Sequence, residues 1–127
     1  MASAVLDASA VLAYVNGEPG AEVVAAVIGD ALISAVNLAE AVTKLVERGG
    51  TLEQASEVLA LAELDVIDFN RALAVQAGGL IAATRAKGLS LGDRACLALA
   101  ARENLPAITA DRVWAALKLG VEVRLIR

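Results

Sequence analysis

Histidine does not occur in this 127-residue sequence, and aromatic residues and cysteine are nearly absent. Without histidine, no site can use imidazole as an acid, a base or a metal ligand. The single tyrosine, phenylalanine and tryptophan are too few to form a platform on which unpaired bases stack. The one cysteine, Cys96, excludes an internal disulfide, and its alanine- and leucine-rich surroundings fit a buried thiol. A reactive site in this chain must therefore depend chiefly on carboxylates.

Long apolar runs and an excess of positive charge are also missing. Stretches such as residues 95–101 fall far short of the ~18 apolar residues that a membrane-spanning helix needs. The first residues lack a basic lead-in, and Asp7 interrupts the apolar segment of a would-be signal peptide. We therefore expect a cytoplasmic protein without membrane association. The net charge of −4 argues against broad wrapping of nucleic acid. Eight arginines against three lysines nevertheless leave local phosphate binding open.

Apolar residues make up 58% of the chain, which indicates one folded domain over residues 1–127. Short apolar runs predict strands at residues 5–6, 31–34, 66–69, 105–109 and 121–126. Helical spacing predicts helices at residues 9–15, 21–28, about 38–46, 52–63, 71–87, 90–103 and 111–117, with a kink or a close contact at Gly78-Gly79. This alternation predicts an α/β fold with a mostly parallel sheet of about four to five strands flanked by helices.

Four carboxylates stand at junctions where a strand or loop meets a helix. Asp7 and Asp111 each follow an apolar run, and Glu40 and Asp93 lie in the first turns of predicted helices. The carboxyl ends of parallel strands meet at one edge of a sheet, where open α/β folds place their sites. Magnesium and manganese prefer oxygen ligands, so such a cluster could hold one or two ions beside a phosphate and a water.

Each carboxylate also has a purely structural interpretation. Asn37 with Glu40 and Ser90 with Asp93 have the spacing of a capping box, which stabilises a helix start by about 1 kcal/mol. On a helical wheel Glu40 lies opposite the apolar stripe, and Lys44 follows it at the spacing of a surface ion pair. Asp111 could cap its own helix, and Asp7 could end its strand in a turn.

Asp93 fits the structural interpretation least well. It enters a helix that is apolar on nearly every face, and a carboxylate near a core needs a partner or a cation. Asp7, flanked by apolar residues, has the same difficulty.

At these residues the chain resembles the PIN-domain ribonucleases, and most closely the VapC-type toxins of toxin–antitoxin pairs. The resemblance rests on four blocks that occur in family order and span essentially the whole chain: Val5-Leu6-Asp7-Ala8-Ser9-Ala10, Ala35-Val36-Asn37-Leu38-Ala39-Glu40, Gly88 to Arg94 with Leu97-Ala98-Leu99-Ala100, and Ile108-Thr109-Ala110-Asp111-Arg112-Val113-Trp114.

The resemblance implies a site and partners. Asp7, Glu40, Asp93 and Asp111 match the family's acidic quartet, which holds Mg²⁺ or Mn²⁺, and Ser9 and Thr109 match hydroxyl residues that support the first and last acids. It implies an endoribonuclease acting on structured RNA such as tRNA or rRNA, a cognate antitoxin that blocks the cleft, and a homodimer. Of the four acids, Asp111 is the least constant in the family.

Two further residues and one rival function complete the expectations. Arg94 and Arg112 each follow a proposed ligand and could contact substrate phosphate, although a surface salt bridge is an equal possibility. The alternative function is a PIN-like module that mainly binds a protein partner through its alanine- and leucine-rich surface, with little catalysis. A receiver-type phosphoacceptor is disfavoured, because Asp7 has no acidic neighbour.

Overall fold

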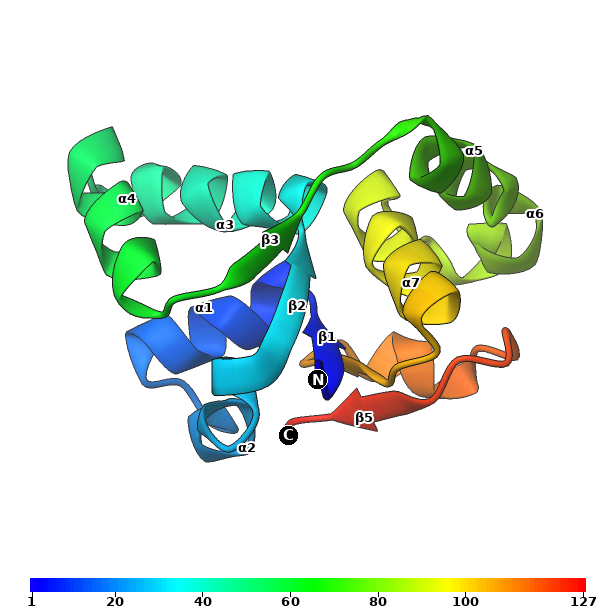
Figure 1. The fold of residues 1–127 in the computed structure, drawn as a ribbon, viewed down its shortest axis with the longest axis horizontal. Coiled ribbons are helices and arrows are strands. Elements are labelled where there is room, and N and C mark those ends of the chain that lie inside the picture. The colour runs from blue at the N-terminus through cyan, green and yellow to red at the C-terminus, as the bar shows by residue number, and fades with distance from the viewer.

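Five short parallel strands form the centre of the computed structural model, which describes residues 1–127 (Figure 1). They are β1 (Ala4–Leu6), β2 (Ala31–Ser34), β3 (Asp65–Ile67), β4 (Ala107–Thr109) and β5 (Val123–Leu125). Their order in the sheet is β3-β2-β1-β4-β5, and all four pairings are parallel. The structure thus confirms the predicted α/β fold with a parallel sheet.

The helical elements connect these strands in chain order. They are α1 (Ala8–Asn16), α2 (Ala21–Ala25), η1 (Ile28–Asp30), α3 (Ala35–Glu47), α4 (Leu52–Leu61), α5 (Arg71–Gly79), α6 (Ile81–Thr84), η2 (Arg85–Lys87), α7 (Leu91–Glu103) and η3 (Arg112–Ala116), where η denotes a 3-10 helix. None of them is long and apolar enough to span a lipid bilayer.

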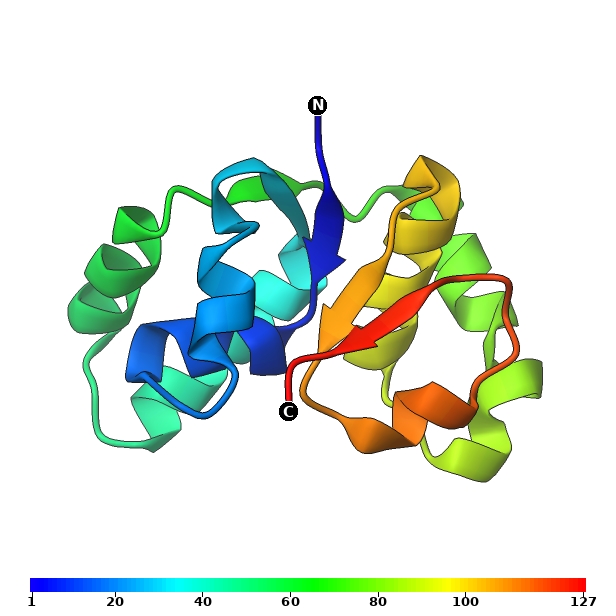
Figure 2. The same cartoon turned by 90° about the horizontal axis from the view of Figure 1, so that it is seen from below.

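The sheet separates two apolar clusters, because successive side chains of a strand point to opposite faces. In β1, Ala4 and Leu6 belong to the cluster formed with α1, α2, α3 and α4. Val5, between them, belongs to the cluster formed with α5, α7 and η3, which includes the buried Cys96 and Trp114. The turned view shows these two groups of helices on either side of the strands (Figure 2). All three residues of β1 are fully buried, which explains its continuous apolar sequence.

Chain direction places a site at the carboxyl end of β1. From β1 the sheet continues through β2 to β3 on one side and through β4 to β5 on the other. The crossover connections therefore diverge between β1 and β4, which is the topological switch point where α/β folds form a crevice. Asp7 and Asp111 follow these two strands directly or within two residues.

Several predicted element boundaries were wrong, and each error has a local cause. Asp7 caps α1, which begins at Ala8 rather than at residue 9, and Ser34, rather than Asn37, caps α3. The helix predicted over residues 21–28 stops at Ala25 and is followed by η1. The helix predicted over residues 71–87 is divided into α5, α6 and η2, and its first break follows Gly78-Gly79, where the sequence predicted a kink or a close contact. Thr51 begins α4 with a capping box, in which its side chain accepts the N–H of Gln54 and the Gln54 side chain accepts the N–H of Thr51.

Candidate active site

Asp7 is the centre of the candidate site because three donors converge on its carboxylate. It directly follows β1 and caps α1, so its Oδ1 accepts the backbone N–H of Ala10 at 2.9 Å. The same oxygen accepts the Ser9 hydroxyl at 2.7 Å, and Oδ2 accepts the Thr109 hydroxyl at 2.5 Å. Asp7 is only 4% exposed. A carboxylate that is buried this deeply and bound by three donors is held in one orientation.

The two hydroxyls connect the ends of β1 and β4. Ser9 Oγ accepts the backbone N–H of Ala110 at 2.9 Å while it donates to Asp7. Thr109 Oγ1 likewise accepts the N–H of Asp111 at 3.0 Å while it donates to Asp7. Each hydroxyl proton is therefore committed to the carboxylate, and each hydroxyl oxygen fixes a backbone amide just after β4. The structure thus gives Ser9 and Thr109 direct contacts with the first acid.

Burial controls the charge of Asp7. Desolvation raises the pKa of its carboxyl from 3.8 to about 6, against the opposing effect of its three hydrogen bonds. The negative charge of Asp93 adds a smaller upward contribution. The dominant cause is loss of water rather than repulsion.

Glu40 is held at the same site from the other side, by α3 and α7. Asn37, which is fully buried, donates one Nδ2 hydrogen bond to Glu40 Oε1 at 3.0 Å and another to the Gly92 carbonyl oxygen at 3.0 Å. Gly92 lies so close to Glu40 that a Cβ there would overlap both carboxylate oxygens. Burial raises the pKa of Glu40, and the Asp93 charge raises it further. The prediction that Glu40 lies on a solvated face of its helix was therefore wrong, because α7 covers this end of α3.

Asp93 combines the structural and the site roles that the sequence left open. Its Oδ2 accepts the N–H of Ser90 at 2.9 Å, and its own N–H donates to Ser90 Oγ at 3.2 Å, which completes the predicted capping box. Its charge nevertheless acts on both Asp7 and Glu40. The helix cap orients the carboxylate without removing it from the site.

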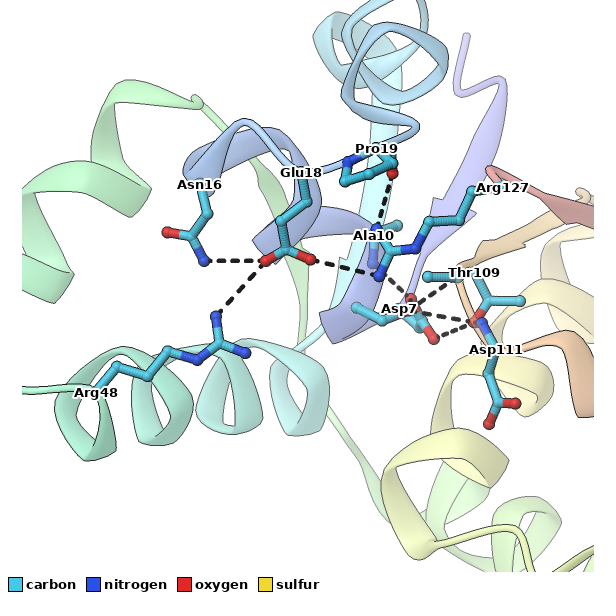
Figure 3. A network of polar contacts seen from close by, with 11 residues as sticks. Asp7, Ala10, Asn16, Glu18, Pro19, Arg48, Thr109, Asp111 and Arg127 are labelled. Atoms are coloured by element: carbon cyan, nitrogen blue, oxygen red, sulfur yellow. Dashed lines mark hydrogen bonds and ion pairs between the residues drawn. The ribbon is translucent and has the colours of Figure 1, made fainter.

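Asp111 is the exposed member of the four. It caps η3 through one hydrogen bond, in which Oδ1 accepts the N–H of Val113 at 3.0 Å. Figure 3 shows it close to Asp7 and Thr109 at the end of the two central strands. The only hydrogen bond that its side chain makes is the one expected of a helix cap.

All four acids line one pocket of about 290 Å³ at the carboxyl edge of the sheet. No three of them stand close enough in this structure to hold one ion together. The donor set still fits a hard divalent cation, since it consists of carboxylate oxygens without nitrogen or sulfur. Burial and repulsion by Asp93 both raise the pKa values of Asp7 and Glu40. A bound cation would offset the cost of burying these charges and their repulsion.

The arginines proposed from the sequence do not line this pocket. Arg94 instead reaches toward α5, where its Nη1 donates to the Ala77 carbonyl oxygen at 2.9 Å. Arg112 is exposed on η3. Successive side chains of a helix point in directions about 100° apart, so neither arginine points the same way as the acid before it.

Other charged residues, which the sequence reasoning missed, line the pocket in their place. They are Glu18, Lys44, Arg48 and Arg127. Lys44 lies one helical turn after Glu40, but its ion pair is with Glu47 at 3.7 Å. Glu18 and Arg127 are 109 positions apart in the sequence, and only the fold brings them together. The sequence paired Asn37 with Glu40 as a capping box; the structure shows instead that the buried Asn37 side chain donates to the Glu40 carboxylate.

The PIN-domain family model matches residues 4–119 of this chain. No curated protein sequence matches it. Among solved structures, it resembles a DNA-bound VapBC complex from Salmonella typhimurium with a TM-score of 0.76, 19% identity and complete coverage of both chains.

Two further structures are similar to the same extent. VapC20 from Mycobacterium tuberculosis, described as a Sarcin-Ricin loop cleaving toxin, has a TM-score of 0.75 and 21% identity over 94% of this chain and 99% of that one. A toxin–antitoxin complex from Klebsiella pneumoniae has a TM-score of 0.72 and 22% identity over 98% of each chain. At these identities the likeness establishes the shared fold.

Proposed function

We propose, because this chain belongs to the PIN-domain family, that it is a metal-dependent endoribonuclease of the VapC toxin type. The observation that carries the proposal is that Asp7, Glu40, Asp93 and Asp111, from four separate segments, line one pocket at the switch point of the sheet. Two of these acids carry raised pKa values, which clusters of this kind show at functional sites. Structured RNA, such as tRNA or rRNA, is the proposed substrate.

The residues of the chain have distinct parts in this proposal. Asp7, Glu40 and Asp93 would hold Mg²⁺ or Mn²⁺, with Asp111 completing the set. Ser9 and Thr109 keep Asp7 in place, and Asn37 keeps Glu40 in place. A bound divalent ion would supply activation of the attacking water and stabilisation of the charge that develops on phosphorus. Hydrolysis of this kind leaves a 5′-phosphate and a 3′-hydroxyl.

A cognate antitoxin is the proposed protein partner, and a homodimer the proposed assembly. An apolar groove of about 320 Å³ between α3 and α4 supports a protein-binding surface. Seven of its nine lining residues are hydrophobic, and Leu52 and Val66 in it are exposed. The same groove supports the second candidate function, a PIN-like module that binds a partner and cleaves little or nothing.

Incubation of the purified protein with structured RNA in Mn²⁺ or in EDTA tests the proposed function. We expect Mn²⁺-dependent cleavage that disappears in Asp7→Ala, and product ends that carry a 5′-phosphate. Glu57→Ala, which removes an exposed acid on α4, is the matched control and should cleave normally. Mn²⁺ should also raise the melting temperature of the wild type more than that of Asp7→Ala.

Two results would contradict the proposal. Products ending in a 2′,3′-cyclic phosphate would show that the 2′-hydroxyl of the RNA attacks, which a metal-activated water does not explain. Absence of Mn²⁺-dependent cleavage, together with an unchanged melting temperature in Mn²⁺, would favour the protein-binding module.

A further inference from the structure

Glu18 lines the acidic pocket but differs from the four acids in its partners. It belongs to the turn between α1 and α2, and its carboxylate lies between two arginines (Figure 3). Oε1 is 3.4 Å from Arg127 Nη2, and Oε2 is 3.6 Å from Arg48 Nη1. Asn16 Nδ2 also donates to Oε2 at 3.2 Å. A carboxylate already surrounded by positive charge and by an amide donor is poorly placed as a further metal ligand.

The two arginines reach Glu18 from different parts of the fold. Arg48 is the C-cap of α3, and Arg127 follows β5. Arg127 is also anchored independently of Glu18, because its Nη1 donates to the Pro19 carbonyl oxygen at 2.8 Å. The turn packs tightly here: Gly20 has a φ of +95°, and a Cβ on it would lie 2.6 Å from the Ile126 carbonyl oxygen. The fold therefore fixes where the Arg127 guanidinium lies.

The contacts of Glu18 with these guanidiniums are loose. Charge-assisted hydrogen bonds between a guanidinium and an oxyanion are typically about 2.7–2.9 Å long, whereas both distances here are 3.4 Å or more. Glu18 is the only carboxylate within ion-pair distance of either guanidinium, so a single carboxylate is shared between two arginines. The side chains of Arg48 and Arg127 are 54% and 37% exposed, which leaves both open to an anion from solvent.

We propose that Arg48 and Arg127 form a subsite for a backbone phosphate of the RNA, and that Glu18 occupies this subsite as an internal anion in the free protein. A phosphodiester has the charge of a carboxylate and can accept hydrogen bonds from both guanidiniums. The subsite borders the pocket of the four acids, so it would hold a phosphate beside the one that is cleaved. This inference rests on the proposed function, since it takes RNA as the ligand.

Binding of a fluorescently labelled RNA stem-loop in EDTA, where metal-dependent cleavage cannot occur, tests the subsite. Arg48→Ala and Arg127→Ala should each weaken binding and reduce the salt dependence of log K by about 0.7–0.9, the value for one phosphate contact. The defect of each variant should therefore shrink about threefold between about 50 mM and about 200 mM salt. Glu18→Gln should tighten binding, because it removes the competing anion.

The Arg102–Glu103 pair at the far end of α7 provides matched controls. Its distance is 3.2 Å, its side chains are 35% and 37% exposed, and it does not line the pocket. Arg102→Ala and Glu103→Gln therefore make the same changes in charge away from the site. In addition, Glu18→Gln should lose its effect when Arg48 and Arg127 are both alanine, since Glu18 acts through them.

The subsite proposal is overturned if the wild type does not bind the stem-loop, if Arg48→Ala and Arg127→Ala bind like Arg102→Ala, or if Glu18→Gln has the same effect with and without the two arginines. The proposed function is tested separately by Mn²⁺-dependent cleavage. A protein that shows the expected binding pattern but does not cleave RNA keeps the subsite and loses the nuclease assignment. If the wild type cleaves RNA in Mn²⁺ but Arg48→Ala and Arg127→Ala bind the stem-loop as the wild type does, the nuclease assignment stands and the subsite proposal fails.

Discussion

The ends of β1 and β4 are alike in sequence and different in environment. Each strand is a short apolar run that is soon followed by an aspartate and a helical segment, and the two strands pair directly. Asp7 and Asp111 each cap the segment that follows, through the N–H of Ala10 at 2.9 Å and of Val113 at 3.0 Å. Asp7 is buried with two additional hydroxyl donors, whereas Asp111 is exposed and has none.

The difference arises from what covers each strand end. α1 packs on the central strand and buries Asp7 under it, but η3 leaves the Asp111 side chain in solvent. Glu40 is intermediate: it is half-buried and held by one side-chain amide. The same capping motif therefore places a buried carboxylate of fixed orientation and raised pKa after β1, and an exposed carboxylate with a single hydrogen bond after β4. We expect the effects of substitution to follow this order of burial.

Asp7→Asn should have the largest effects, and in opposite directions for activity and stability. The neutral amide removes a proposed ligand, so cleavage should fall by more than the ~10–100-fold typical of outer contacts. In the wild type, the folded-state pKa of about 6 lies above the ordinary 3.8, so the folded protein binds more protons than the unfolded one between these values. Its free energy of unfolding should thus fall by roughly 3 kcal/mol as the pH rises through this window.

Urea unfolding in EDTA, at several pH values from about 3.5 to about 7.5, measures this effect. Asp7→Asn lacks the titrating group. The free energy of unfolding of the variant, relative to that of the wild type, should therefore grow with pH and level off above about pH 6. Parallel curves for the two proteins would show that Asp7 is not desolvated in solution. Asp111→Asn is the control, because its side chain is exposed.

The sequence was sufficient to predict the strand ends but not their environments. An apolar run followed by an acid and a helix indicates a strand end at a parallel edge, and this pattern located Asp7 and Asp111. Burial depends on which helix later covers that edge, and a pattern local in sequence carries no such information. Glu40 illustrates the limit: its helical wheel indicates solvent, because the wheel does not include the Gly92 turn of α7.

Charged partners brought together by long-range packing were the least predictable part of the site. Arg94 and Arg112 were chosen for their adjacency to acids in sequence, and the helix turns both away. Glu18 meets Arg127 because the α1–α2 turn packs against the residues after β5, and it meets Arg48 because the end of α3 lies beside the same turn. Asn37 and Ser34 show the same limit on a local scale, since either could have capped α3.

Gly92→Ala should have an intermediate effect and tests the position of Glu40. The added Cβ overlaps the Glu40 carboxylate, which is the end of a flexible side chain and can swing aside. The fold should therefore survive, with a gain of up to about 1 kcal/mol from helical propensity. Displacement of the carboxylate by about 1 Å or more should lower cleavage by about 100-fold.

Thermal melting and kinetics on the same preparation separate these effects of Gly92→Ala. A variant that is at least as stable as the wild type and loses cleavage confirms that Gly92 makes room for Glu40. Gly78→Ala, also helical and with open space around its Cβ position, is the matched control and should retain activity. Full activity of Gly92→Ala would show that Glu40 does not need its observed position.

Asp111→Asn should have the smallest effect and completes the comparison of the two strand ends. Asparagine caps helices about as well as aspartate, so the hydrogen bond from Val113 persists and the free energy of unfolding should change by less than ~0.5 kcal/mol. Because the side chain is exposed, the variant should show no pH-dependent gain in stability like that of Asp7→Asn. Cleavage should fall less than in Gly92→Ala, since solvent can replace an exposed ligand more readily than a buried one. A loss as large as that of Asp7→Asn would show that exposure in the free protein does not rank these carboxylates. The two strand ends would then contribute equally once metal and RNA are bound.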